Sequence, residues 1–338
     1  MEKKGKAGTI LRAVGNIKEL TLIIVLVVVV IIFWMINPNY LSSGNIRAIF
    51  NSAFVMGILA VGAACLLIGG KIDLSAGNTG MLAGVLIAIL LKTGMNWIPA
   101  LIITLVFGAV TGLINAFFIN GLAFAPFIST LAVSAVYGGI ALVLTNSANI
   151  SINKQANSTF LALGSSNIWI FPVPFFILIV LLAIYGFVLS SSGFGRRVYM
   201  TGGNANAARL AGINPKKITT ILYINGGVIS CIAGVLLAAL MNMGSPLSVT
   251  GSDLDGITAA ILGGVAFTGG KGNMFGVFIG IILITSFQNG LVVAGLDAYY
   301  RVVAKGLLLI AALILDYYRE NARLRSLKTG SEIVDKHA

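Results

Sequence analysis

Residues 191–217 read SSGFGRRVYMTGGNANAARLAGINPKK and lie between two strongly apolar runs. Asn204 is suited to begin a helix in this polar stretch, because its side-chain oxygen can accept from the free N–H groups of a first turn. Most of the next seven residues are strong helix formers. Gly212 suits the left-handed position after a last turn, and Pro215 prevents the helix from continuing. We therefore expect a helix of about two turns, which is too short to be stable alone and must dock on another surface.

Two interpretations of this short helix remain open at the level of sequence. It can be a connector that ends two membrane spans, or a coupling helix on which a partner protein pushes. Its small alanines permit a close approach, Arg209 offers a guanidinium fork to oxygen atoms of a partner, and Leu210 is a natural apolar anchor. Under the second interpretation the contact residues are Asn204, Ala205, Ala207, Ala208, Arg209, Leu210, Ala211 and Gly212.

The composition is that of a membrane protein. The chain has 338 residues and 41 glycines, and 58% of its residues are hydrophobic and 9% are charged. A soluble domain carries about 25% charged residues, and many glycines allow helices to approach closely in lipid. The net charge of +12 does not indicate nucleic-acid binding, because the basic residues sit in short loops between apolar runs. We therefore predict an all-α, polytopic membrane protein.

The apolar runs predict about ten transmembrane helices. The first run has no charge and lacks the small-residue cleavage site of a signal peptide. We expect an N-terminal tail at 1–19, a transmembrane domain at 20–317 that includes the 191–217 loop, and a C-terminal tail at 318–338. The predicted spans are 20–36, 46–68, 74–91, 97–117, 127–144, 168–190, 218–241, 254–267, 274–293 and 302–317.

The basic residues predict the orientation of these spans. With the N-terminus inside, 17 Lys and Arg residues face the cytoplasm and 5 face outward, a bias typical of the positive-inside rule. Both termini and the 191–217 stretch are therefore expected in the cytoplasm. Lys305 lies near the outer face and is expected to extend outward to the interface. The longest outer loop, 145–167, is either a solvated linker or a landing surface for an extracytoplasmic binding protein.

Several kinds of site are excluded by residue content. His337 is the one histidine, so no histidine-based metal site or triad can form. Cys65 and Cys231 lie in apolar runs and are expected to be packing residues. The GGKG sequence at 269–272 is not a phosphate loop, which needs G-x-x-x-x-G-K-[ST], and is expected to be a tight turn between spans. The chain is therefore predicted to hold no nucleotide, metal or cofactor of its own.

Asp73 lies in the segment 69–77, GGKIDLSAG, which interrupts two apolar runs. A charge at the bilayer centre costs about 3 kcal/mol or more, so Asp73 must be paired, solvated or near the interface. In one interpretation its carboxylate caps the third span by accepting from first-turn N–H groups. In the other, a broken helix enters the membrane, where glycines let the backbone bend and Asp73 contributes to a gate.

Neutral polar residues inside the spans are candidates for lining a translocation pathway. Their amides and hydroxyls suit an uncharged, polyhydroxylated solute, because they offer donors and acceptors without a fixed charge. Phe54 can pack on the apolar face of a sugar. Each of these residues can instead serve only to bridge neighbouring helices. The predicted pathway residues are Asn51, Phe54, Asp73, Ser75, Asn115, Ser129, Thr130, Asn225, Gln288 and Asn289.

Three strings together resemble one known family: GGKIDLSAG at 69–77, GRRVYMTGGNANAARLAGINPKK at 195–217 and LGGVAFTGGKGNMFGVFIG at 262–280. They are similar to motifs of the ribose-type permeases of bacterial ABC importers, in the branched-chain amino acid and ribose permease family. The closing run VVAKGLLLIAALILD at 302–316 also fits. The chain departs from the family pattern at Lys71, where a glycine is usual, and near Asn206, where an acidic residue is common.

The resemblance implies a type II ABC importer permease that forms the path for a monosaccharide such as ribose across the bacterial inner membrane. It implies a second permease chain, identical or different, and an extracytoplasmic sugar-binding protein. It also implies cytoplasmic ATP-binding subunits, which hold ATP and Mg²⁺ and contact the coupling residues named above. The chain itself is then no enzyme.

Three alternatives stay open beside this interpretation. The solute can be a nucleoside or an autoinducer-type sugar. An ion-coupled secondary transporter would need carboxylates inside the membrane, and of the ten acidic residues only Asp73 is expected within a span. An intramembrane enzyme would need a nucleophile with an activating partner, and no cluster of His, Cys or paired carboxylates indicates one.

Overall fold

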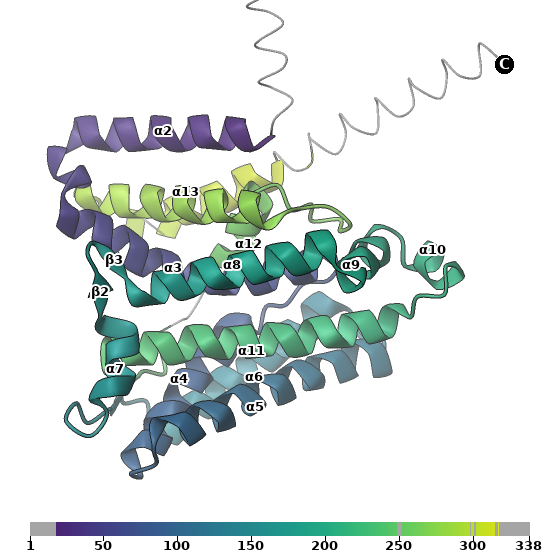
Figure 1. Cartoon of the computed structure of the whole chain (residues 1–338), viewed down its shortest axis with the longest axis horizontal. Helices are drawn as coiled ribbons and strands as arrows, with labels where there is room; N and C mark the ends of the chain where they lie inside the picture. The colour runs from purple at the N-terminus through teal and green to yellow at the C-terminus, as the bar shows by residue number, and fades with distance from the viewer. Residues whose placement is uncertain (1–17, 249–251, 298, 301, 315–316, 318–338) are drawn as a thin grey trace, which may run out of the picture.

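The structure, a computed structural model, describes residues 18–248, 252–297, 299–300, 302–314 and 317. Within these residues the fold is helical (Figure 1), and the predicted all-α class is confirmed. Two antiparallel pairs of two-residue strands accompany the helices. They are β1 (Ile150–Ser151) with β4 (Met243–Gly244), and β2 (Asn167–Ile168) with β3 (Phe171–Pro172).

Six helices in the described part of the chain are long and apolar enough to cross a membrane. They are α3 (Ser43–Ile68), α5 (Trp97–Ala116) with its continuation η2 (Phe117–Gly121), α6 (Pro126–Thr145), α8 (Val173–Ser191), α11 (Pro215–Met241) and α13 (Met274–Val293). Three further helices have shorter apolar runs: α2 (Lys18–Ile36), α4 (Ala76–Lys92) and the helix Val302–Ile314.

The predicted count of about ten spans is not confirmed. The span expected at 254–267 is instead α12 (Ser252–Leu262), a helix of 11 residues. Such a helix is about 17 Å long, whereas the hydrocarbon core is about 30 Å thick, so α12 cannot cross alone. The prediction failed because the apolar run 254–267 continues past the end of the helix into a turn, where Gly264 has a φ of +90°.

The bundle is centred on α11, which packs against α3, α4 and α5. Glycines make this packing possible. A Cβ atom on Gly234 of α11 would lie 1.7 Å from the carbonyl oxygen of Gly80 on α4, and one on Gly112 of α5 would lie 2.1 Å from that of Tyr223. Backbone-to-backbone contacts of this kind are typical of helices in lipid. On the outside, α2, α5, α6 and α8 expose large apolar side chains, as lipid-facing helices do.

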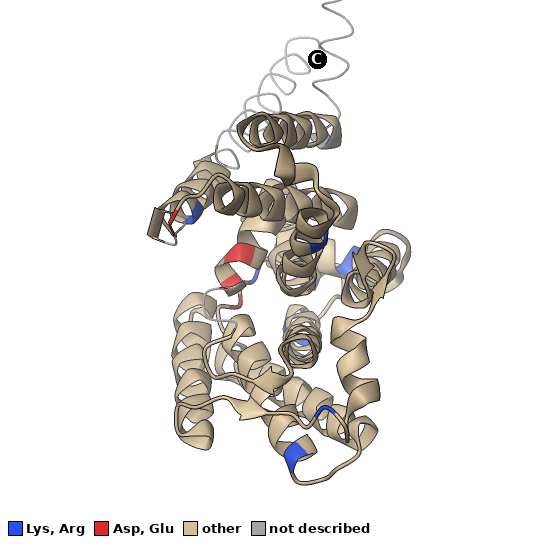
Figure 2. Ribbon diagram, turned by 90° about the vertical axis from the view of Figure 1, so that its left-hand side faces the viewer, with Lys and Arg blue, Asp and Glu red and all other residues tan. Residues whose placement is uncertain are grey.

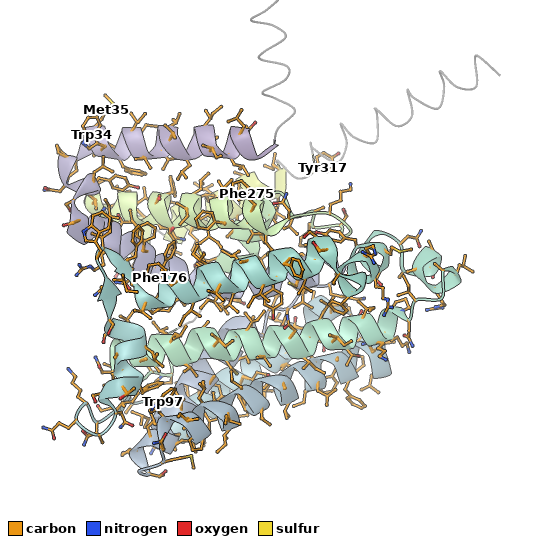
Figure 3. The ribbon with its side chains drawn as sticks, viewed as in Figure 1. Trp34, Met35, Trp97, Phe176, Phe275 and Tyr317 are labelled. Carbon is orange, nitrogen blue, oxygen red and sulfur yellow. The ribbon has the colours of Figure 1, made fainter. Side chains whose placement is uncertain are left out.

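The two ends of the bundle differ (Figure 1). One end, called here the α10 end, carries α9 (Gly193–Gly203) and α10 (Ala205–Leu210). The opposite end, called here the far end, carries the short strands, η1 (Pro38–Leu41) and α7 (Ser158–Ser165). Trp34 and Trp97 both lie at the far end (Figure 3). Aromatic residues are enriched at membrane–water interfaces, so their position marks one boundary of the membrane-embedded part.

The loop 145–167 at the far end is more structured than a solvated linker. It contains β1 and α7, and Phe160 on α7 is buried. A Cβ atom on Gly164 would lie 2.3 Å from the backbone nitrogen of Leu240 on α11, so α7 lies directly on the central helix. Its role as a landing surface for a binding protein stays a prediction.

Two helices, α4 and α12, begin inside the bundle. After Ile68 ends α3 at the α10 end, the chain turns back, and the Tyr223 hydroxyl within α11 donates to the Ile72 carbonyl at 2.8 Å. On the other side, Gly256 of α12 packs against the backbone of Leu59 in the interior of α3. Both first turns therefore lie at membrane depth, which brings the polar residues around them into the bundle.

Candidate coupling surface and translocation pathway

The two-turn helix predicted at the centre of 191–217 is present as α10. The Asn204 side chain accepts from the backbone N–H groups of Asn206 and Ala207, each at 3.0 Å. At the other end Gly212 has a φ of +79°, and its N–H donates to the Arg209 carbonyl at 3.0 Å. Both caps are those expected from the sequence, and they close a short helix that stands at the end of the bundle.

The exposure of α10 divides the predicted contact residues. Leu210 is 92% exposed, whereas Ala208 is only 1% exposed because it packs against its own chain. Leu210 and Arg209 are therefore open to a partner, whereas the Ala208 side chain, a contact residue in the sequence prediction, is not. The other predicted contact residues, Asn204, Ala205, Ala207, Ala211 and Gly212, are exposed.

The sequence analysis did not predict the helix α9, because within 191–217 it expected only the short helix that begins at Asn204. Four glycines lie in this helix or at its ends, and glycine disfavours helix interiors. Ser192 caps the helix by accepting from the Gly195 N–H at 3.0 Å. The Tyr199 hydroxyl donates to the Gly272 carbonyl at 2.7 Å. Burial raises the pKa of Tyr199 above its ordinary value, so the hydroxyl keeps the proton that it donates. Tertiary contacts therefore hold α9 despite its glycines.

Three Gly-Gly pairs meet at the α10 end: 69–70, 202–203 and 269–270. We call this cluster the glycine junction. The Gly270 N–H donates to the Ile68 carbonyl at 2.8 Å. A Cβ atom on Gly202 would lie 1.9 Å from the same carbonyl oxygen, so no side chain fits there.

The glycine junction joins three parts of the chain that are far apart in sequence. A Cβ atom on Gly269 would lie 2.7 Å from the Gly202 carbonyl oxygen and 2.9 Å from the Gly70 Cα atom. Gly203 directly precedes Asn204, the cap of α10. The end of α3, the end of α9 and the turn before α13 therefore form one backbone-to-backbone contact next to the candidate coupling helix. The expected tight turn at 269–272 is part of it.

The segment that follows α3 forms a buried polar cluster. The Asp73 carboxylate accepts from the Ser75 N–H at 2.8 Å and from the Ser75 hydroxyl at 2.6 Å. The Asn115 amide donates to the Ser75 hydroxyl at 2.8 Å, and the Leu74 N–H donates to the Thr130 hydroxyl at 3.0 Å. Four predicted pathway residues thus lie together: Asp73, Ser75, Asn115 and Thr130.

The geometry of Asp73 differs from the predicted cap. Ser75 is the residue that precedes α4, so the carboxylate binds the N–H of the N-cap residue and not those of the first turn. The segment 69–75 enters the bundle before the helix starts, as the broken-helix interpretation expected. Whether the segment also gates a pathway stays a prediction.

The remaining predicted pathway residues do not gather in one place. Phe54 is fully buried in the core, and Ser129 lines an apolar cavity with Phe118 and Val133. Asn225 accepts a hydrogen bond from the Tyr185 hydroxyl. Gln288 and Asn289 line a polar cavity. Asn51 precedes Ser52, which also lines this cavity.

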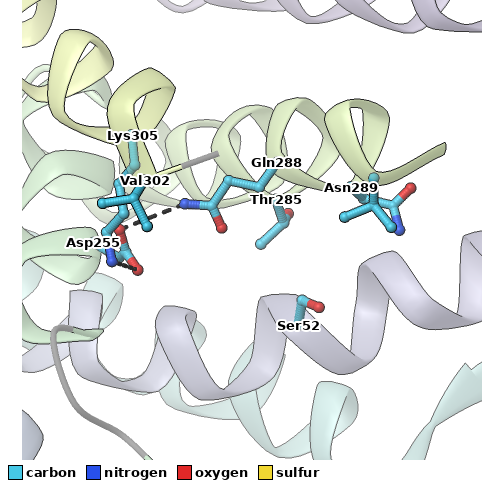
Figure 4. A pocket seen from close by; sticks show the side chains of 8 residues that line it. Ser52, Asp255, Thr285, Gln288, Asn289, Val302 and Lys305 are labelled. Carbon is cyan, nitrogen blue, oxygen red and sulfur yellow. Dashed lines mark hydrogen bonds and ion pairs between the residues drawn. The ribbon is translucent and has the colours of Figure 1, made fainter. Parts of the chain in front are cut away.

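This polar cavity contains an ion pair that the sequence analysis did not expect. Lys305 Nζ lies 2.7 Å from Asp255 Oδ2, and Gln288 Nε2 lies 3.5 Å from Asp255 Oδ1. Figure 4 shows the Lys305 and Gln288 side chains pointing toward Asp255. The prediction that Lys305 extends outward is therefore wrong. The sequence analysis did not predict that Asp255 pairs with Lys305, because it assigned residues 254–267 to an apolar span.

The sequence analysis named only Asp73 among the acidic residues as lying within a span, and it did not consider the two aspartates that begin α12, next to Gly256, which packs on α3. Charged residues colour little of the ribbon in Figure 2, and acidic ones gather on the first turn of α12, which holds Asp253 and Asp255. The sequence signal for this turn was the pair of aspartates at the start of a short apolar run.

Comparison with known proteins decides the family. The family model described as "Branched-chain amino acid transport system / permease component" matches residues 45–313. The chain belongs to this permease family. It is therefore a multi-pass membrane permease subunit of an ABC importer, a transport component and not an enzyme. A permease of this kind works with ATP-binding and substrate-binding partners.

Several curated permeases are similar to this permease over most of their length. The ribose import permease protein of Bacillus subtilis (strain 168) is 32% identical over 302 residues, 89% of this chain and 94% of that protein. A probable ABC transporter permease protein of Escherichia coli (strain K12) is 31% identical over 299 residues, 88% and 89% of the two chains. The D-allose transport system permease protein of the same strain is 32% identical over 294 residues, 86% and 89%. No solved structure matches.

Proposed function

We propose that this permease imports a monosaccharide such as ribose, which an extracytoplasmic binding protein delivers. The relatives named for ribose and D-allose support this proposal, because each is matched over at least 89% of its length. Neutral hydroxyl and amide groups predominate in the buried polar cluster and the polar cavity, and such groups suit an uncharged solute. A nucleoside or an autoinducer-type sugar presents similar hydroxyl groups and is the alternative substrate.

The single observation that carries the coupling proposal is the exposure of Leu210. A leucine that is 92% exposed on a capped helix, at the end of a membrane bundle, makes almost no contact with its own chain. We propose that Leu210 inserts into an apolar cleft of the ATP-binding subunit, with Arg209 beside it. Closure of the ATP-binding subunits then pushes α10, and the glycine junction passes this movement to the segment 69–75 and to the turn before α13. The bundle thereby alternates between two accessible states.

The coupling proposal is tested by Leu210→Asp in the complete importer, with Leu210→Met as the matched control. We expect Leu210→Asp to reduce co-purification with the ATP-binding subunit and ATP-driven sugar uptake by about tenfold or more, since an apolar anchor contributes a large share of interface energy. Leu210→Met should behave as the unaltered protein. Full coupling in Leu210→Asp would make α10 an ordinary connector.

We also propose that the α10 end faces the cytoplasm, with both termini on that side, and that two permease chains assemble around the pathway. The bias of basic residues supports the orientation. Ala207→Cys at the α10 end should resist a membrane-impermeant thiol reagent in intact cells, whereas Lys154→Cys in the far-end loop should react. Both positions are exposed, and Cys65 and Cys231 are buried, so reversed labelling would overturn this orientation.

A further inference from the structure

The polar cavity described above has the size of a site for a small molecule. Its volume is about 390 Å³, and ligand sites in proteins are about 300–1,000 Å³. It lies between α3, α12, α13 and the helix Val302–Ile314 (Figure 4). Its lining residues are Ser52, Asp255, Thr285, Gln288, Asn289, Val292, Val302 and Lys305. Six of these eight carry polar side chains, in a chain whose residues are 58% hydrophobic.

The cavity extends from the interior of the bundle toward the far end. Asp255 precedes Gly256, which packs on the interior of α3. Val292 lies next to the last residue of α13, whose end points to the far end (Figure 1). The Asp255–Lys305 ion pair therefore stands toward the inner part of the cavity, where charges inside a membrane domain are expensive and mark functional sites.

The chemistry of the lining suits an uncharged solute with many hydroxyl groups. Asp255 and Lys305 neutralise each other at 2.7 Å, so the pair adds no net charge to the cavity. The Asn289 Oδ1 atom is buried and has no hydrogen-bond partner among the described residues. The Thr285 hydroxyl donates to the Ile281 carbonyl at 2.8 Å and keeps its lone pairs to accept. The cavity thus offers acceptors from the amide, hydroxyl and carboxylate groups and donors from Gln288 and Lys305.

We propose that this cavity is the subsite at which the permease receives a monosaccharide, with Asp255, Lys305 and Gln288 binding its hydroxyl groups. The inference rests on the proposed function and adds to it the residues and the chemistry of the site. A zwitterionic amino acid fits less well, because its ammonium and carboxylate groups would have to separate Asp255 from Lys305. Asp255, Lys305 and Ser52 thereby join Gln288 and Asn289 as pathway residues.

The test uses the complete importer in proteoliposomes, with its ATP-binding subunits and binding protein. Uptake of radiolabelled D-ribose, D-allose, L-arabinose and L-leucine is measured together with ATP turnover. Ser52→Phe fills the cavity from an exposed position on α3, and Gln288→Leu removes one amide. Ser190→Phe is the matched control, because Ser190 is also exposed but lies on α8, away from the cavity.

We expect the amount of sugar imported per ATP hydrolysed to fall about tenfold in Ser52→Phe and several-fold in Gln288→Leu. Ser190→Phe should keep the ratio of the unaltered importer. ATP turnover stimulated by the loaded binding protein should persist in all three, which a general structural defect would not allow. If the unaltered importer takes up a sugar and both cavity variants keep its ratio, the cavity assignment is overturned while the proposed function stands. Uptake of L-leucine and of none of the sugars would overturn both.

Discussion

The glycine junction and the polar cavity are both places where helices break, and they are constructed in opposite ways. In the junction, three Gly-Gly pairs bring backbones so close that a Cβ atom on Gly202 would lie 1.9 Å from a carbonyl oxygen. In the cavity, side chains leave a space of about 390 Å³. The junction lies beside α10, and the cavity extends toward the far end.

The difference indicates a division of labour within one permease. A junction without side chains has no rotamers that can absorb a displacement, so a movement of α9 must move the end of α3 and the turn before α13 as well. A cavity lined by side chains can adapt to a solute. Variants of the junction should therefore lower both stability and coupling to ATP hydrolysis. Variants of the cavity should lower only the transport of the solute.

The largest expected effect is that of Gly202→Ala. The new methyl group would overlap the Ile68 carbonyl oxygen, and overpacking of this kind costs about 1–3 kcal/mol or more. We expect a clearly lower thermal midpoint of the purified permease and loss of ATP-driven uptake. Gly203→Ala is the control, because its Cβ atom would lie 4.0 Å from the Gly270 Cα atom, at an ordinary contact distance. Equal stability of the two variants would contradict the glycine junction.

Ala208→Glu should also destabilise the permease itself. Ala208 is 1% exposed on a helix that contacts α9 and α11, so a glutamate there would bury a carboxylate, at a cost of about 2 kcal/mol or more. Ala207→Glu is the control, since Ala207 is exposed on the same helix. The two thermal midpoints, measured on isolated permease in detergent, should differ. A normal thermal midpoint for Ala208→Glu would show that the Ala208 side chain is not buried and can contact a partner.

The sequence predicted local features well and tertiary ones poorly. The caps of α10 and the bounds 274–293 of α13 follow from residues that are neighbours in the chain. By contrast, the helix α9 is held by the hydrogen bond from Tyr199 to the distant Gly272. The direction of the Lys305 side chain depends on Asp255, which lies 50 positions earlier in the chain. The short α12 was read as a span because hydropathy does not show where an apolar run bends. No local pattern indicates that three Gly-Gly pairs meet.

A smaller effect is expected for Gly212→Ala, beyond the junction. Gly212 has a φ of +79°, and an L-residue in that region costs about 1–2 kcal/mol, although open space surrounds the Cβ position. The last turn of α10 should fray and coupling should fall a few-fold, with little change in the midpoint of the bundle. Gly44→Ala on α3 also adds a methyl group in open space, without a positive φ, and should leave coupling unchanged. Equal coupling in the two variants would show that the cap is dispensable.

The smallest stability effect is expected for Gln288→Leu, which changes the lining of the polar cavity and not the glycine junction. The Gln288 amide contacts Asp255 at 3.5 Å, a distance at which a hydrogen bond contributes little, and Asp255 keeps Lys305 at 2.7 Å. Leucine is apolar and of similar size, so the unfolding free energy should change by no more than about 0.5 kcal/mol. The measurement is the thermal midpoint beside that of Gly202→Ala. A loss of stability as large as that of the junction variant would show that the cavity lining also stabilises the fold, and the two regions would then not differ in their contribution to stability.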